Sequence, residues 1–156
     1  MRRLALLVAT GCGLGYLPFV PATWASFATA LAILPFRGAL TPVLAAVLAA
    51  VLAPVAVAAS HEAEKTLGHD ARPIVIDEVV GMFVGAVGLR HWPGPAGFAE
   101  LVLLFGLFRL FDIAKPWPVG RAQALPGGCG VVADDVLAGV YTAAALWVVS
   151  GFLGRM

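Results

Sequence analysis

The sequence predicts an all-α fold, a polytopic bundle of about four to five membrane helices. Hydrophobic residues make up 61% of the 156 residues and charged residues only 12%, whereas a soluble domain carries about 25% charged residues. A chain with this few charges cannot cover its surface in water. Lipid is therefore the expected solvent for much of the chain. No repeat or low-complexity linker divides residues 1–156, which are expected to form one domain. A net charge of +1 without a basic cluster argues against nucleic-acid binding.

The N-terminal residues combine two arginines with an apolar run that ends at Ala9. This pattern is typical of the start of a signal peptide, but the Gly- and Pro-rich stretch Gly11–Pro21 indicates a shaped loop, so we expect the segment to be retained. Cys12 and Cys129 lack a CxxC partner, which argues against a zinc or redox motif. Small buried thiols are expected, with a disulfide as the alternative.

Five apolar stretches follow one another along the chain: Ala22–Phe36, Leu40–Ala59, Val79–Leu89, Gly97–Phe108 and Val136–Leu153. The third and fourth are shorter than the ~20 residues that a span needs. The third reaches that length if it begins near Ile74 and includes Asp77 and Glu78. The fourth must extend through Arg109 and towards Asp112. Charged side chains are therefore expected at the ends of membrane helices, in five spans, or in four apolar blocks if the short pair forms a hairpin.

Five spans place the loops Gly11–Pro21, Ser60–Ile76 and Lys115–Ala133 on one side of the membrane. Most basic residues share that side: Arg2, Arg3, Lys65, Arg72, Arg109, Lys115 and Arg121, against Arg37, Arg90 and Arg155 on the other. The positive-inside rule makes the first side cytoplasmic. Every carboxylate except Glu100 also falls there, as an active site would produce. The alternative is that charges simply follow the larger loops.

Two pairs of acids form the first candidate site. Asp77 and Glu78 open one apolar helix, and Asp134 and Asp135 are expected to open another. Packed carboxylates repel each other, and a hard cation such as Mg²⁺ removes that repulsion because it prefers oxygen ligands. Helix N-capping is the alternative, but it explains only one acid in each pair. The four residues are therefore candidate metal ligands.

Small residues share the helix faces of both pairs: Gly81, Gly85 and Gly88 after the first, and Ala138, Gly139 and Thr142 after the second. Such faces let two helices approach closely, so the two pairs are expected to meet at one site. The same faces are compatible with a homodimer.

A basic motif lies in the segment Phe108–Pro118. Arg109 and Asp112 share a helix face, and Lys115 precedes a Pro-Trp-Pro stop. Arginine binds phosphate through two parallel hydrogen bonds and lysine binds it as a point charge. The alternative is a salt-bridged helix end whose cations extend to the membrane interface.

Thr23 is expected to cap the helix that begins near it, with Ser26 three residues later. Helix N-termini bind phosphate through free N–H groups, although an ordinary capped helix also explains this stretch. His61 opens the charged segment 60–70 and is a candidate acid, base or ligand. A lone histidine is more often structural, and His69 and Asp70 carry the same ambiguity.

Four stretches are specific when taken together: GLGYLPFVPATWAS (13–26), IDEVVGM (76–82), FRLFDIAKPWP (108–118) and GGCGVVADDVLAG (127–139). Over about Gly11–Tyr141 the chain resembles the phosphatidylglycerophosphatase A family. By this resemblance Asp77, Glu78, Asp134 and Asp135 match the acidic motifs of the family. Arg109, Asp112 and Lys115 match its basic motif, and Thr23 and Ser26 match its first loop. Ala22 and Ala25 stand where the family usually has glycine, which would strain the loop if φ were positive there.

The resemblance implies a Mg²⁺-dependent phosphatase of the bacterial inner (plasma) membrane, multi-pass, with its active site facing the cytoplasm. Its substrate would be phosphatidylglycerophosphate, and its products phosphatidylglycerol and inorganic phosphate. The candidate catalytic residues are Asp77, Asp112, Asp134, Asp135 and His61, and attack by water or by a carboxylate stays open. Alternatives from other classes are a small transporter that uses the same acids as a relay and a structural subunit whose acids only pair with the basic motif.

Overall fold

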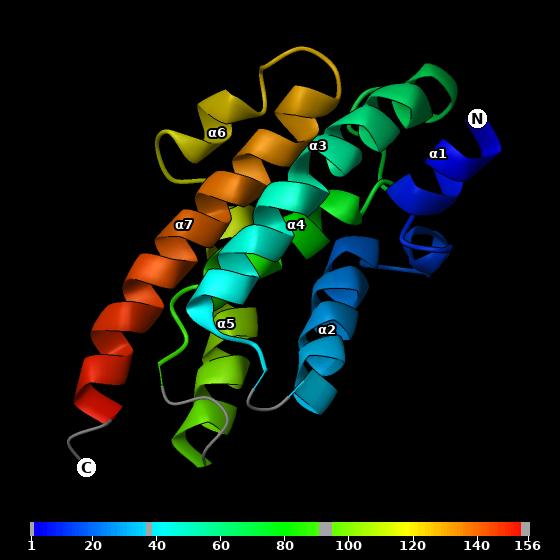
Figure 1. Ribbon diagram of the computed structural model, residues 1–156. Coiled ribbons are helices and arrows are strands. Elements are labelled where there is room, and N and C mark those ends of the chain that lie inside the picture. Colours follow the sequence, from blue (N-terminus) through cyan, green and yellow to red (C-terminus); the bar gives the residue numbers. More distant parts are fainter. Residues whose placement is uncertain (1, 37–38, 91–94, 154–156) are drawn as a thin grey trace.

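The computed structural model describes residues 2–36, 39–90 and 95–153, and over these residues the chain is helical and contains no strand (Figure 1). The α-helices are α1 (Arg2–Ala9), α2 (Pro21–Ile33), α3 (Pro42–Leu67), α4 (Ile76–Ala86), α5 (Pro95–Ala114), α6 (Val119–Ala122) and α7 (Gly128–Leu153). Two 3-10 turns, η1 (Leu14–Tyr16) and η2 (Leu34–Phe36), flank α2. The predicted all-α fold class is confirmed.

Two helices are long and apolar enough to cross a membrane, α3 and the segment Gly128–Gly151 of α7. Helix α5 has 20 residues but carries three charged ones, and α2 and α4, with 13 and 11 residues, fall below the ~17 that a span needs. The composition and these two helices suggest association with a membrane. The number of four to five spans stays a prediction.

Helices α4 and α5 begin and end where the charge pattern predicts. Asp77 and Glu78 lie in the first turn of α4, and α5 continues through Arg109 and Asp112 to Ala114. Helix α3 runs further than expected, because helix-forming residues continue to Gly68, whose φ of 97° ends it. The first part of the predicted loop 60–76, residues 60–67, is therefore helical.

Helix α7 begins at Gly128, so Asp134 and Asp135 lie inside the helix and not at its start. The run Gly127–Gly130 suggested a loop, but its glycines instead permit close packing. A Cβ on Gly128 would overlap the carbonyl oxygen of Val57 in α3. N-capping by the second acidic pair is therefore excluded, and both acids project from the body of a packed helix.

Helices α4 and α7 touch through their small residues, as predicted. A Cβ on Gly139 would lie 2.5 Å from the carbonyl oxygen of Gly81, and a Cβ on Gly85 would lie 3.0 Å from Cγ2 of Thr142. This contact brings the first turn of α4 beside Asp135. Because these faces pack against each other within one chain, they give no separate support for a homodimer, which stays a prediction.

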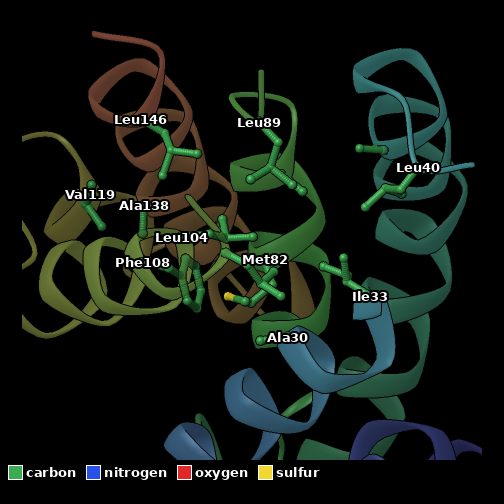
Figure 2. Packing of buried hydrophobic residues seen from close by; sticks show 13 residues of the cluster. Ala30, Ile33, Leu40, Met82, Leu89, Leu104, Phe108, Val119, Ala138 and Leu146 are labelled. Carbon is green, nitrogen blue, oxygen red and sulfur yellow. The ribbon is translucent and has the colours of Figure 1, made fainter. Parts of the chain in front are cut away.

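The apolar core lies directly beside the charged residues. Met82 is at its centre, with Phe108 and Leu104 of α5 on one side and Ala30 and Ile33 of α2 on the other (Figure 2). Between helices in lipid, such side chains stabilise the contact through close van der Waals packing. Met82 follows Glu78 by one helical turn, and Phe108 directly precedes Arg109. The charged residues are therefore carried by tightly packed helices.

Helix α1 packs against α3 through a second cluster that includes Ala9, Ala59 and Ala63. The backbone N–H of Val75 donates to the carbonyl of Ala9 at 2.8 Å, which ties α1 to the residues before α4. The prediction of buried thiols is wrong. Cys12 and Cys129 are free and exposed, because the first lies in a turn with φ 56° and the second on the outer side of the start of α7.

Candidate active site

A cavity of about 650 Å³ opens where the start of α2, the α3–α4 loop, α4, the end of α5 and α7 meet. Its charged lining residues are Asp70, Arg72, Asp77, Glu78, Arg109, Asp112, Lys115, Asp134 and Asp135. Its apolar lining includes Phe19, Val20, Pro21, Ile74 and Ile113. Both predicted acidic pairs and the basic motif therefore meet at one cavity, as the sequence predicts.

Five carboxylates form two overlapping groups. One oxygen from each of Asp77, Glu78 and Asp135 lies within 4.8 Å of the others, and the same holds for Asp112, Asp134 and Asp135. All except Asp112 are buried, at 8% relative exposure or less. Asp135 belongs to both groups and is the centre of the cluster.

Several oxygens of this cluster lack a hydrogen-bond partner. Among the described residues, Oδ1 of Asp77, Oε2 of Glu78 and Oδ2 of Asp135 are buried and unpaired. Buried charged oxygens without partners are costly. A hard divalent cation offers what they lack, since it takes carboxylate oxygens as ligands. The donor set therefore fits such a cation, and it adds Asp112, which the sequence suggested as a catalytic residue and not as a ligand.

Arg109 faces the cluster from the last turns of α5. Its Nη1 lies 2.9 Å from Oδ2 of Asp112 and 4.0 Å from Oε1 of Glu78. The same Nη1 donates to Oγ of Ser26 at 3.5 Å, and its Nε is buried without a partner. The predicted i, i+3 pair with Asp112 is thus formed, and the guanidinium keeps an unused donor.

Lys115 ends α5 with a φ of 41° and donates from Nζ to Oδ2 of Asp134. Burial alone would lower the pKa of Lys115. The hydrogen bond and the charge of Asp134, with the charges of Asp112 and Asp135, outweigh burial and raise this pKa above its ordinary value. Lys115 is therefore a cation at neutral pH.

The N-terminus of α2 lines the cavity through Pro21, Ala22 and Thr23. The prediction that Thr23 is the N-cap is wrong. The helix starts three residues earlier than a cap at Thr23 would place it, because proline favours the first helical position, and Val20 precedes it without a side-chain cap. The N–H groups of Ala22 and Thr23 have no carbonyl partner within the helix and are available to an anion.

Comparison with known proteins decides the family. A family model described as Phosphatidylglycerophosphatase A matches residues 7–150. The chain belongs to the phosphatidylglycerophosphatase A family. It is 33% identical to the Phosphatidylglycerophosphatase A of Escherichia coli K12, over 92% of this chain and 81% of that protein. It is 30% identical to the Haemophilus influenzae protein of the same name, over 92% and 86%.

A third relative, from Bacteroides thetaiotaomicron, is named "Putative phosphatidylinositol-3-phosphatase" and is 33% identical over 94% of this chain and 96% of that protein. No solved structure matches the chain. Membership of the phosphatidylglycerophosphatase A family identifies the chain as a phosphatase, a phosphoric monoester hydrolase.

The two alanines of the first loop fit the structure without strain. Ala22 and Ala25 lie inside α2, and neither is among the residues with positive φ. Ala25 is only 1% exposed, so the space at this position accommodates a methyl group. The family glycines therefore mark no left-handed conformation here.

Two predicted residues lie outside the cavity lining. Ser26 is buried, donates to the carbonyl of Ala22 at 2.9 Å and reaches the site only through Arg109. His61 is exposed on α3 beside Gly127, where a Cβ would lie 2.6 Å from its Nδ1. The structure does not bring His61 to the carboxylates.

Sequence reasoning did not select Arg72 as a site residue and left Asp70 undecided, yet both line the cavity. They precede α4 in a loop that contacts the first loop of the chain, since a Cβ on Gly15 would overlap Pro73. The signal that could have found them was their place on the same predicted membrane side as the other charged residues.

Proposed function

We propose that the chain hydrolyses the terminal phosphomonoester of phosphatidylglycerophosphate to phosphatidylglycerol and inorganic phosphate, with Mg²⁺, as a step of phospholipid biosynthesis. The observation that carries this proposal is one cavity in which five carboxylates face Arg109 and Lys115. The substrates in the names of the three relatives share a terminal phosphomonoester on a lipid headgroup.

The apolar side of the cavity supports a lipid substrate. Phe19, Val20 and Ile113 line it and are 91%, 51% and 72% exposed. Phe19 also has a φ of 72°, which is costly for a bulky residue and turns its ring outward. An acyl glycerol can pack on these side chains while its headgroup reaches the carboxylates.

The carboxylate cluster would hold the metal. Asp77, Glu78 and Asp135 form one set of oxygen donors, and Asp112 and Asp134 complete a second set with Asp135. A bound divalent cation supplies charge neutralisation to the phosphate and activates water for attack at phosphorus. The unpaired buried oxygens of the cluster are the observation that supports this role.

The cations and the start of α2 would bind the phosphate. Arg109 and Lys115 offer charged donors, and Ala22 and Thr23, which have free N–H groups, line the same cavity. These groups stabilise charge on the equatorial oxygens during transfer. A bond forms between the attacking oxygen and phosphorus, the phosphorus–oxygen bond to glycerol breaks, and the alcohol leaves with a proton.

The attacking group is either water or a carboxylate such as Asp112, which is the most accessible of the five acids, with 14% of its side chain exposed. Carboxylate attack would leave a phosphorylated enzyme that water then hydrolyses. Trapping with labelled substrate separates the two routes, because only the second gives labelled protein. Substitution of His61 would also show whether this exposed histidine has any part in catalysis, because a slower release of phosphate would implicate it.

The cavity would open at the cytoplasmic surface of a bacterial inner membrane that the chain crosses four to five times. The α3–α4 loop, α6 and α1 lie at one end of the bundle, opposite the end of α7 (Figure 1). The cytoplasmic assignment rests on the basic residues that gather at this end.

Phosphate release from phosphatidylglycerophosphate by purified protein in detergent tests the proposal. We expect release with Mg²⁺, none with EDTA, and loss of release in Asp134→Asn. Glu62→Gln is the matched control, because Glu62 pairs with Lys65 on α3 outside this cavity. A folded protein that binds Mg²⁺ but releases no phosphate would contradict the substrate. Solute flux into liposomes without phosphate release would favour a transporter instead.

A further inference from the structure

We propose that Arg72 binds the phosphodiester group of the lipid substrate and so selects lipids that carry both a phosphodiester and a terminal phosphomonoester. The inference rests on the proposed function and assigns a second phosphate subsite to the same cavity. This subsite lies on the α3–α4 loop, apart from α5, which carries Arg109 and is followed by Lys115.

Arg72 differs from the other cations of the cavity in its partners. Arg109 is paired with Asp112 and Glu78, and Lys115 is paired with Asp134. Arg72 is exposed, lines the cavity and forms no ion pair with any residue that the structure describes. Its charge is therefore available to an incoming anion, whereas the other two already neutralise carboxylates.

The loop that carries Arg72 is fixed on both sides. Before it, the N–H of Asp70 donates to Oε1 of Glu64 at 3.1 Å, and the side chain of Gln123 donates to Oδ2 of Asp70. After it, Ile74 and Val75 are buried, and Val75 donates to Ala9. An arginine on a fixed backbone loses less conformational entropy when it binds a ligand.

The size of the cavity fits a headgroup with two phosphates. A volume of about 650 Å³ lies within the range of about 300–1,000 Å³ that holds a whole small ligand. The carboxylate cluster, Arg109 and Lys115 supply one end for the terminal monoester. The guanidinium of Arg72 can bind two oxygens of the diester in parallel, which a lysine cannot do.

The test compares Arg72→Gln and Arg72→Lys with wild type in mixed micelles at fixed Mg²⁺. KM for phosphatidylglycerophosphate should rise about tenfold in Arg72→Gln, as expected for loss of a charge-assisted hydrogen bond, with kcat nearly unchanged. Phosphatidic acid has the monoester but no diester, so its inhibition constant against the same reaction should not change. Arg72→Lys should fall between the two proteins.

Arg121→Gln is the matched control, because Arg121 is exposed on α6 and does not line the cavity. The inference would be overturned, while the proposed function stands, by any of three results. Arg72→Gln could weaken the binding of both lipids equally or of neither, or Arg121→Gln could raise KM by the same factor. Wild-type protein that releases no phosphate from phosphatidylglycerophosphate would overturn the proposed function and the inference with it.

Discussion

The Nζ atom of Lys115 lies 2.5 Å from Oδ2 of Asp134 and joins the end of α5 to the body of α7. Removal of the lysine leaves Asp134 without its cation beside three other buried acids. We expect Lys115→Met to reduce kcat/KM for phosphatidylglycerophosphate by about 100-fold or more, the size seen when one charged donor to a transition state is lost. Lys115→Arg should recover part of the activity. Initial rates of phosphate release measure both, and near wild-type rates for Lys115→Met would contradict the assigned role.

The same pair makes a prediction about pH. Because the pKa of Lys115 is raised on folding, the pair contributes its full effect below the ordinary lysine pKa of about 10.4, as long as Asp134 is ionised, and loses this effect as pH rises through the higher folded value. Thermal unfolding in detergent, followed by tryptophan fluorescence, should show a lower Tm for Lys115→Met than for wild type at pH 8. The difference should shrink at pH 11, and a constant difference would count against the pair.

Asp135 belongs to both groups of carboxylates, so its substitution should affect metal binding more than substitution of either neighbour. We expect Asp135→Asn to shift the Mg²⁺ concentration for half-maximal activity upward by about tenfold or more, given the usual cost of losing a charged ligand interaction. Asp77→Asn removes a member of one group only and should shift it less. A titration of activity with Mg²⁺ checks this order, with Glu62→Gln as control. An unchanged half-maximal Mg²⁺ concentration in Asp135→Asn would contradict the prediction.

Gly81 should tolerate no larger side chain. A Cβ there would lie 2.5 Å from Cε2 of Phe108 and 2.7 Å from the carbonyl of Asp135, so Gly81→Ala should destabilise the fold by about 1–3 kcal/mol through overpacking. Gly106 lies in α5 with no atom within 4 Å of a Cβ, so Gly106→Ala should be neutral or stabilising. Thermal unfolding of the two variants measures the contrast, and equal Tm values would show that the α4–α7 contact is looser than described.

Phe19 provides a test of the lipid-binding wall. Phe19→Gly removes an exposed ring and relieves a φ of 72°, so Tm should not fall. KM for a long-chain substrate should rise about tenfold, as expected if the ring buries apolar area against the lipid. A water-soluble phosphomonoester should show no such rise. If both substrates respond alike, Phe19 shapes the catalytic residues and not the acyl binding surface.

Much of the site could be predicted because its charges interrupt apolar helices. Asp77, Glu78, Arg109 and Asp112 stand out where two short stretches need them to reach membrane length, and the structure places all four at the cavity. The close contact of α4 and α7 could also be predicted. Small residues recur on one face of each helix, and the glycines at 81, 85 and 139 lie at this contact.

Other features could not be predicted because they depend on tertiary contacts. The start of α7 at Gly128 needs the backbone of α3 beside it, and glycine alone suggests a loop. Thr23 resembled an N-cap, but the ring of Pro21 sets the first helical residue. Arg72 shares its predicted membrane side with the other charges, but it lies in an exposed loop without periodicity, so its place in the cavity lining had to come from the folded chain. The exposed position of His61 is likewise visible only in the structure.

The direct backbone contact between Gly81 and Gly139 has a consequence for motion. At this point Gly139 packs against the carbonyl oxygen of Gly81 and the side chain of Val84, a β-branched residue with few rotamers that would let the helices slide. We therefore expect the two helices to move as one rigid body, so that the distances among their acids stay constant while a lipid enters. Any movement that opens the cavity to the headgroup must then involve the residues around Phe19 and the end of α5, which also line the cavity.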